Sequence, residues 1–153
     1  VLDALRQPAA ASVRCVILGN GEARDDLLTL IDAYELGARV TLVGQVDESE
    51  LLDYMARCRA VCVPAAAEDY GLVTVEAFAS RKAVITCTDS GGPTELVVDG
   101  TNGFVVAPEA SALAAVIGRV MEDASLAEQL GATASQHASE MTWTRALDQL
   151  LLV

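Results

Sequence analysis

Five short apolar runs alternate with amphipathic segments along most of the chain. The runs are rich in β-branched residues and short enough for buried strands, and they cover residues 13–18, 40–43, 61–63, 83–86 and 103–106. The segments between them place apolar residues at helical spacing over residues 22–36, 51–57 and 68–80, and a short helix starts at Pro93. Crossovers of this length join parallel strands, so the pattern predicts an α/β fold with a Rossmann-like, doubly wound parallel sheet.

Several residues mark the expected ends of the helices in this α/β region. Residues 1–6 have a helical pattern without a cap before them. Gly37 predicts the end of the helix over residues 22–36, because glycine favours the left-handed conformation that closes a helix. The acidic group at residues 47–50 predicts the start of the helix over residues 51–57.

Beyond Pro108 the pattern becomes entirely helical. Helices are expected over residues 110–123, 125–140 and 142–153. Ser125 and Glu128 have the spacing of a capping box. We therefore divide the chain into an α/β core, residues 1–106, and a C-terminal helical tail, residues 107–153.

Length and charge limit the classes of function. The chain has 153 residues, about one domain, and a formal net charge of −12 with Lys82 as its only lysine. A protein that binds nucleic acid needs a basic face, so a nucleic-acid partner is not expected. An anionic ligand would have to be held by backbone N–H groups and a few local cations.

The sequence predicts a cytoplasmic protein without a membrane span. The apolar runs are all shorter than the roughly 18 residues that a membrane-spanning helix needs, and the first residues lack the basic start of a signal peptide. The four cysteines lie in or beside apolar runs and show no Cys-x-x-Cys spacing: Cys15, Cys58, Cys62 and Cys87. We interpret them as small buried hydrophobic residues in a reducing compartment, with no metal site.

Two carboxylates, Glu68 and Glu76, bracket a Tyr-Gly pair in the stretch over residues 64–78. Two further motifs follow, Cys-Thr-Asp-Ser-Gly-Gly-Pro-Thr-Glu at residues 87–95 and Asp-Gly-Thr-Asn-Gly-Phe at residues 99–104. In this order and at these spacings, the three motifs resemble the signature of glycosyltransferase family 4, in the C-terminal, donor-binding half of a GT-B enzyme. The resemblance covers nearly all of the chain.

The resemblance also bears on residues 72–75, Leu-Val-Thr-Val, which carry two opposed signals. Three β-branched residues in four favour a strand. A strand there would break the alternation of strands and helices, and the family has a helix at this place. We therefore predict a helix that opens near Gly71 or Leu72, with its free N–H groups directed at the loop that carries Glu68.

The resemblance assigns roles within this signature. It implies that Glu68 lies beside the donor sugar and hydrogen-bonds its hydroxyls or assists the reacting face. It implies that N–H groups around Tyr70, Gly71 and Leu72 meet the phosphates and that Glu76 accepts hydrogen bonds from the ribose. Tyr70 stands where the family usually has Phe. The alternative for Glu76 is a solvated carboxylate that complements the helix dipole.

A glycine pair, Gly19 and Gly21, follows the first strand and precedes a helix. A dinucleotide-binding motif would need a third glycine where Arg24 stands. The resemblance implies instead that this loop faces the interdomain cleft near the donor phosphates, and that Gln45 and Val46 line the nucleobase pocket. A tight turn without a ligand remains the alternative for the glycine pair.

Two other features have less specific interpretations. The stretch Asp-Ser-Gly-Gly-Pro at residues 89–93 is a turn that leads into a helix, and both a structural turn and a ligand contact remain open for it. His137, the only histidine, falls in a predicted helix away from these loops, where a surface or packing role is expected.

The resemblance implies the donor-binding domain of a retaining, metal-independent, hexosyl-type glycosyltransferase. The donor is a nucleotide diphosphate-sugar, which serves as substrate, with no further cofactor. In the family, three features lie outside the region that this chain matches, chiefly in an N-terminal domain. They are the acceptor site, the Arg and Lys that bind the diphosphate, and any peripheral membrane contact. We therefore expect the isolated chain to bind weakly and not to turn over. A non-catalytic nucleotide-binding or scaffold module, a GT-B nucleotide-sugar epimerase and, less favoured, an oxidoreductase remain alternatives.

Overall fold

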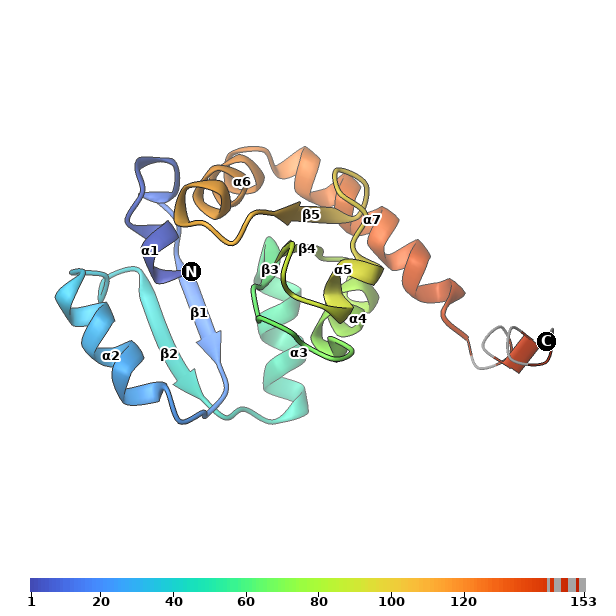
Figure 1. Cartoon of the computed structure of the whole chain (residues 1–153), viewed down its shortest axis with the longest axis horizontal. Coiled ribbons are helices and arrows are strands. Elements are labelled where there is room, and N and C mark those ends of the chain that lie inside the picture. The colour runs from blue at the N-terminus through green and yellow to red at the C-terminus, as the bar shows by residue number, and fades with distance from the viewer. Residues whose placement is uncertain (143, 145–146, 149–150, 152–153) are drawn as a thin grey trace.

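The computed structural model describes residues 1–142, 144, 147–148 and 151. Its strands are β1 (Cys15–Leu18), β2 (Val40–Gly44), β3 (Ala60–Val63), β4 (Ala83–Cys87) and β5 (Gly103–Val106). Its α-helices are α1 (Leu2–Leu5), α2 (Arg24–Ala33), α3 (Glu48–Arg57), α4 (Leu72–Ala79), α5 (Gly92–Leu96), α6 (Ala110–Glu122) and α7 (Ala124–Glu140), with a 3-10 turn at Pro8–Ala10 (Figure 1). The predicted alternation is confirmed. Much of the helix expected from residue 142 onward, including Trp143 near its start, lies outside the described residues.

All strands are paired in parallel, as predicted, but they form two groups. β1 pairs with β2, with Cys15 opposite Val40, and β3, β4 and β5 pair in that order, with Val84 opposite Gly103. Within the described part of the chain no ladder joins β1 to β3, so the single sheet that we expected is divided at this point. The two groups lie beside one another (Figure 1), and side chains of one core cluster pack between them.

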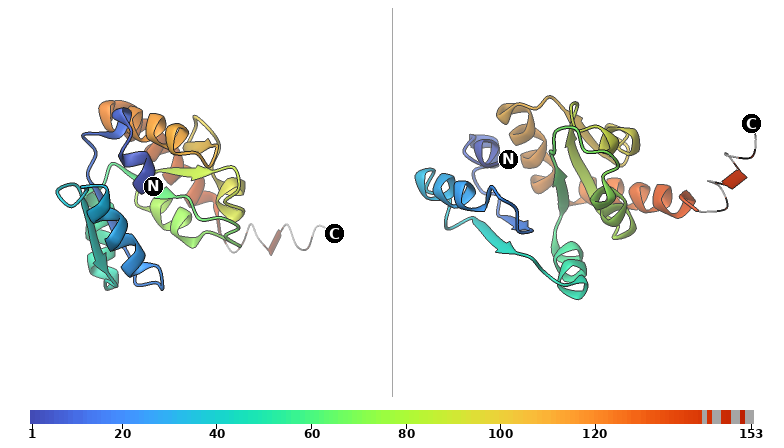
Figure 2. Two further views of the ribbon diagram at one scale, coloured as in Figure 1. Left: turned by 60° about the vertical axis from the view of Figure 1, so that its left-hand side comes forward. Right: turned by 60° about the horizontal axis from the view of Figure 1, so that its bottom comes forward.

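Helices cover both faces of the β3–β5 group, as a doubly wound arrangement requires. One face packs on α4, α5 and α7 through a cluster that includes Phe78, Val84 and Ala134. The other face packs on α1 and α6 and toward β1 through Ile85, Phe104 and their neighbours. Figure 2 shows α7 following α6 in chain order and running out toward the C-terminus. β4, in the middle, is buried along its whole length.

The cysteines behave as core residues. Cys87 is buried, and Cys15 and Cys62 are partly buried against the same cluster. Burial raises the pKa of the Cys62 thiol to about 12 and also raises the pKa values of Cys15 and Cys58. These thiols therefore stay protonated at neutral pH and pack as small apolar groups.

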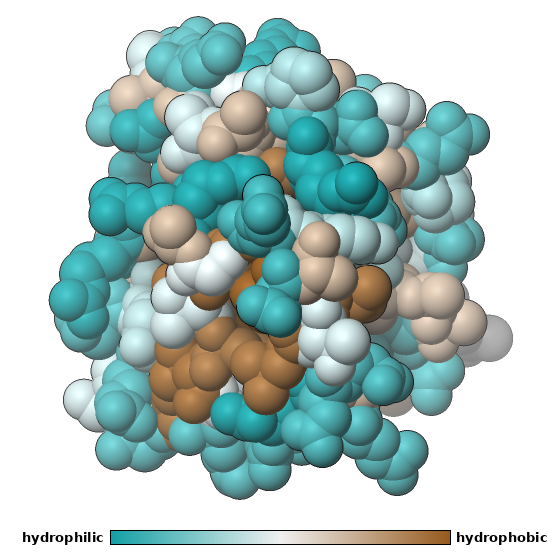
Figure 3. Space-filling view, turned by 90° about the vertical axis from the view of Figure 1, so that its left-hand side faces the viewer, coloured by the Kyte–Doolittle hydropathy of each residue, from teal (hydrophilic) through white to brown (hydrophobic). Residues whose placement is uncertain are grey.

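The end of α2 differs from the prediction. The residue in the left-handed conformation is Glu35, with φ of 54°, and not Gly37. Buried Leu36 donates its N–H to the Ile31 carbonyl oxygen at 2.9 Å, so the chain turns inward two residues before the glycine. α2 also leaves Leu28 and Leu30 exposed, and the face that carries this helix shows apolar patches among polar ones (Figure 3).

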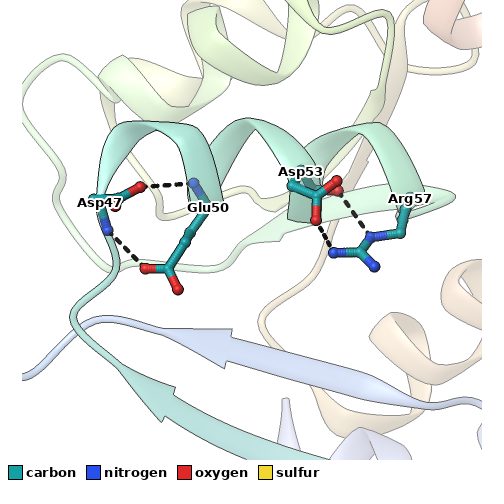
Figure 4. A network of polar contacts seen from close by, with 4 residues as sticks. All are labelled: Asp47, Glu50, Asp53 and Arg57. Atoms are coloured by element: carbon teal, nitrogen blue, oxygen red, sulfur yellow. Dashed lines mark hydrogen bonds and ion pairs between the residues drawn. The ribbon is translucent and has the colours of Figure 1, made fainter.

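The starts of α3 and α7 are capped by aspartates. In α3, Asp47 Oδ1 accepts from the Glu50 N–H at 2.8 Å, and Glu50 accepts from the Asp47 N–H at 3.1 Å (Figure 4). The helix therefore starts at Glu48, within the group at residues 47–50 that predicted its start. The capping box expected at Ser125 is wrong, because Asp123 caps α7 by accepting from the Leu126 N–H at 2.9 Å. A single extended residue separates α6 from α7, which leaves Ser125 inside the first turn.

Asn102 ties the segment after α5 to the helical tail. Its side chain is fully buried, accepts from the Val98 N–H at 2.8 Å and donates to the Leu96 carbonyl oxygen at 3.1 Å. Its Nδ2 also lies 2.8 Å from His137 Nδ1 on α7. His137 thus packs within the domain, far along the chain from the carboxylate signature. None of the helices in the described residues is long and apolar enough to span a bilayer.

Candidate functional site

Two loops at the carboxyl ends of β3 and β4 are locked together through their backbones. Glu68 donates its N–H to the Ser90 carbonyl oxygen at 3.0 Å, and its own carbonyl oxygen accepts from the Gly92 N–H at 2.8 Å. Buried Thr86 and Ser90 fix the strand ends beneath, since the Thr86 hydroxyl donates to the Val63 carbonyl oxygen at 2.8 Å. The position of Glu68 is therefore set by backbone contacts, while its carboxylate is exposed.

Glycines make this approach of the two loops possible. A Cβ on Gly91 would lie 2.6 Å from the Glu68 carbonyl oxygen, and one on Gly92 would lie 2.6 Å from the Asp69 carbonyl oxygen. A Cβ on Gly71 would lie 2.7 Å from Pro93 Cγ. Gly71 and Gly91 also have positive φ values of 75° and 72°, a conformation that favours glycine. The Gly-Gly-Pro turn therefore packs directly against the loop that carries Glu68.

The helix predicted at the carboxylate signature is confirmed as α4. Gly71 precedes its first turn, and among the described residues no side chain caps this end. The free N–H groups of such a turn carry about half a positive charge and favour an anion. Leu72 and Tyr70 are exposed beside it, at 65% and 61% of their full surface.

Glu76 lies one turn into α4, on its exposed face with Leu72. Side chains four residues apart on a helix are neighbours, whereas Thr74, Ala77 and Phe78 face the core. Glu68 in the loop, the amino end of α4 and Glu76 in the helix therefore follow one another along this segment.

The predicted glycine loop lies at the carboxyl end of the other strand pair. Gly19, with φ of 115°, donates its N–H to the Gly44 carbonyl oxygen at 2.7 Å, which joins the ends of β1 and β2. Gly19 and Gly21 border a shallow hollow of about 170 Å³ between these strands and α2. Exposed Gln45 and half-buried Val46 follow directly after β2. The hollow does not include the signature residues, so the predicted site residues form two groups, one on each set of strands.

The sequence missed the contribution of Gly91 and Gly92 to this site. Their spacing in the sequence is typical of a turn. Their role in packing against residues 68–70 depends on the fold and is not visible in the sequence. Around the site, in the described residues, no three His, Cys, Asp or Glu side chains gather as metal ligands would. The only Lys, Lys82, lies at the opposite end of β4 from the Gly91 turn.

The fold and the motifs agree with one known family. The profile of that family, described as glycosyl transferases group 1, matches residues 1–137. The chain belongs to this family. It is 32% identical over 137 residues to the alpha-D-kanosaminyltransferase of Streptomyces kanamyceticus, which covers 88% of this chain and 35% of that protein. This group 1 chain therefore spans about a third of the length of the curated relatives it matches.

Solved structures place the group 1 chain in the GT-B class of folds. Anabaena Alr3699/HepE, solved in complex with UDP and glucose, is 29% identical with a TM-score of 0.83 and matches 99% of this chain and 42% of its own. The C-terminal domain of a glycosyl transferase group 1 family protein from Francisella tularensis has a TM-score of 0.79 at 21% identity, over 92% of this chain and 76% of its own. At that identity the likeness shows the fold alone.

Proposed function

We propose that this chain is the donor-binding domain of a retaining, metal-independent glycosyltransferase of family 4. It moves a hexosyl-type sugar from a nucleotide diphosphate-sugar to an acceptor. The observation that carries the proposal is the backbone lock between Glu68 and the Ser90–Gly92 turn, with hydrogen bonds of 3.0 and 2.8 Å. This contact places a carboxylate, which can accept hydrogen bonds from sugar hydroxyls, in the loop that leads into an uncapped helix end, which can bind a diphosphate.

The diphosphate is proposed to lie at the amino end of α4. Its oxygens accept hydrogen bonds from the backbone N–H groups around Tyr70, Gly71 and Leu72, and Gly71 lets the backbone approach them without a side chain in between. Glu76, one turn further on, accepts from the ribose hydroxyls. The complex of the relative HepE with UDP and glucose supports a donor of this class.

The second group of residues is proposed to hold the nucleoside end. The turn at Gly19 and Gly21 faces the phosphates, and Gln45 and Val46 border the nucleobase. The bond between the Gly19 N–H and the Gly44 carbonyl oxygen, 2.7 Å, keeps these two turns together. The two site groups then contact different parts of one extended donor molecule.

In the transfer step, the bond between the anomeric carbon and the diphosphate oxygen breaks, and its electron pair leaves with the diphosphate. The acceptor hydroxyl oxygen bonds to the anomeric carbon, and its proton passes to the departing diphosphate oxygen. The amino end of α4 stabilises the developing charge on the diphosphate. Glu68 holds the hydroxyls of the sugar in place and stabilises positive charge on the reacting ring.

The domain is proposed to need a further part of the protein for activity. The facing edges of β1 and β3 have no strand partner among the described residues, so a parallel strand from elsewhere in the protein would complete the sheet next to the diphosphate. Cations from that region would offset the strongly acidic character of this chain, whose net charge is −12. A second domain would bind the acceptor. We therefore expect the isolated chain to bind a nucleotide weakly and not to turn over.

The role of Glu68 is tested by Glu68→Gln in the complete protein that contains this domain. The variant keeps the size of the side chain and the backbone lock, but removes the charge. We expect transfer to slow on the order of 100-fold, with affinity for the free nucleoside diphosphate changed by less than about threefold. The measurements are sugar transfer to acceptor and calorimetric titration with the nucleotide.

Asp69→Asn is the matched control, because Asp69 is the exposed neighbour in the same loop and has no assigned task. It should retain nearly full transfer. Equal losses in both variants would contradict the specific role of Glu68. Release or epimerisation of the donor sugar without acceptor would favour the epimerase alternative, and nucleotide binding with no sugar chemistry would favour a scaffold module.

A further inference from the structure

Four cations line one hollow of about 210 Å³ on the edge of the β3–β5 group away from the donor site. The hollow is bordered by Arg57, Cys58, Arg59, Arg81, Lys82, Ala124, Ala127 and Glu128. These cations are four of only ten lysines and arginines in a chain with a net charge of −12. The concentration of positive charge at one place in an acidic protein indicates a role for this hollow beyond general solubility.

The hollow lies at the amino ends of two strands. Arg59 directly precedes β3 and Lys82 directly precedes β4, whereas Glu68 and Gly91 follow the carboxyl ends of the same strands. The first turn of α7 provides the remaining wall through Ala124, Ala127 and Glu128. It is therefore a different place on the molecule from the proposed donor site.

Backbone carbonyl groups position two of these cations without neutralising them. Lys82 Nζ donates to the Ala56 carbonyl oxygen at 2.9 Å, and Arg59 donates to the Met121 carbonyl oxygen. A carbonyl carries no net charge, so the ammonium and guanidinium groups keep theirs and have further N–H donors to offer. Arg57 pairs with Asp53 on the exposed face of α3 (Figure 4).

Arg81 is held by its backbone at the turn after α4. Its φ is 59°, and its N–H donates to the Phe78 carbonyl oxygen at 3.0 Å, while the Lys82 N–H donates to the Ala77 carbonyl oxygen at 2.9 Å. Gly131 of α7 closes over this turn, since a Cβ on Gly131 would lie 2.2 Å from the Arg81 carbonyl oxygen. The turn is thus fixed in place, while the Arg81 side chain borders the hollow.

We propose that this hollow is a second ligand site, which binds a small phosphorylated molecule through its phosphate group. Arg57 pairs with Asp53, which leaves Arg59, Arg81 and Lys82 as the other cations that border the hollow, beside one carboxylate, Glu128. Guanidinium and ammonium groups together match an oxyanion with several oxygens. A recessed volume of about 210 Å³ suits a phosphate monoester. The proposal does not depend on the donor site, which uses other residues.

The test is an NMR titration of the chain with inorganic phosphate, with chloride adjusted to constant ionic strength. Backbone amide signals of residues 57–59 and 81–82 should shift and saturate at millimolar phosphate, while those of residues 68–76 should not follow the same curve. Arg81→Gly should weaken this binding about tenfold, as expected for loss of a charge-assisted contact. Glycine suits the left-handed conformation of residue 81, so the variant should fold at least as well as the wild type.

Arg14→Gln is the matched control, because it removes one exposed positive charge outside the hollow. It should leave phosphate affinity within about twofold of the wild type. Shifts that never saturate, or equal weakening by both variants, would overturn the proposal and show general attraction between phosphate and positive charge. Saturation centred on residues 68–76 would also overturn it and would assign the phosphate to the donor site.

Discussion

Gly91→Ala is expected to abolish binding of a nucleoside diphosphate and to destabilise the domain. The added Cβ would lie 2.6 Å from the Glu68 carbonyl oxygen, and residue 91 would keep a φ of 72°, which a side chain disfavours. The loop that carries Glu68 must move away, which also displaces Gly71 and the amino end of α4. We expect the free energy of unfolding to fall by about 2 kcal/mol or more, combining strain and overpacking. Calorimetric titration and denaturant unfolding measure the two effects.

Gly100→Ala is the matched control for Gly91→Ala. Gly100 has a similar φ of 69°, but a Cβ there meets no described atom within 4 Å. The variant should lose only the conformational term, about 1 kcal/mol, and should bind nucleotide as the wild type does. Unchanged nucleotide binding by Gly91→Ala would contradict the proposal that close backbone contact with Gly91 positions the loop that carries Glu68.

Gly103→Ala is expected to destabilise the domain more than Gly91→Ala does, without touching the donor site. A Cβ on Gly103 would lie 2.1 Å from the Val84 carbonyl oxygen and 2.9 Å from Val97 Cγ1. Gly103 pairs with Val84 in the ladder between β5 and fully buried β4, so neither strand can move without disturbing the core. We expect a loss of about 3 kcal/mol in the free energy of unfolding, which lowers the midpoint of thermal unfolding by roughly 6–12 °C.

The control is Gly37→Ala, because Gly37 is exposed and a Cβ there meets no atom within 4 Å in the described part of the chain. Its stability should differ from that of the wild type by less than about 1 kcal/mol. A stable Gly103→Ala variant, with a thermal midpoint like that of Gly37→Ala, would show that β4 and β5 tolerate a wider separation than the structure has.

The alternation of strands and helices was predictable, since most of the elements follow from local pattern. The hardest case was α4, where Val73, Thr74 and Val75 favour a strand by propensity. The helix forms because Thr74, Ala77 and Phe78 share a buried face at helical spacing. The segment joins two parallel strands, and the burial of its helical face there outweighs its local preference for a strand.

Features that depend on contacts between distant segments could not be predicted. The hydrogen bonds between Glu68 and the Ser90–Gly92 turn join loops more than twenty residues apart, and residue spacing gives no information on their register. The same reason explains the division of the strands between β1 and β3, which depends on ladder pairing. The errors at helix ends were smaller. For α7 we predicted a cap at Ser125, but Asp123 is the cap, because neighbouring residues compete for one capping position.

The central claim is that the amino end of α4 and Glu76 bind a nucleoside diphosphate. The most direct measurement is calorimetric titration of this chain with UDP, GDP and ADP, repeated with Glu76→Ala. We predict that one of the three binds and that Glu76→Ala weakens its binding at least tenfold, as loss of a charged hydrogen bond implies. Binding that is equally strong in Glu76→Ala would contradict the proposed donor site.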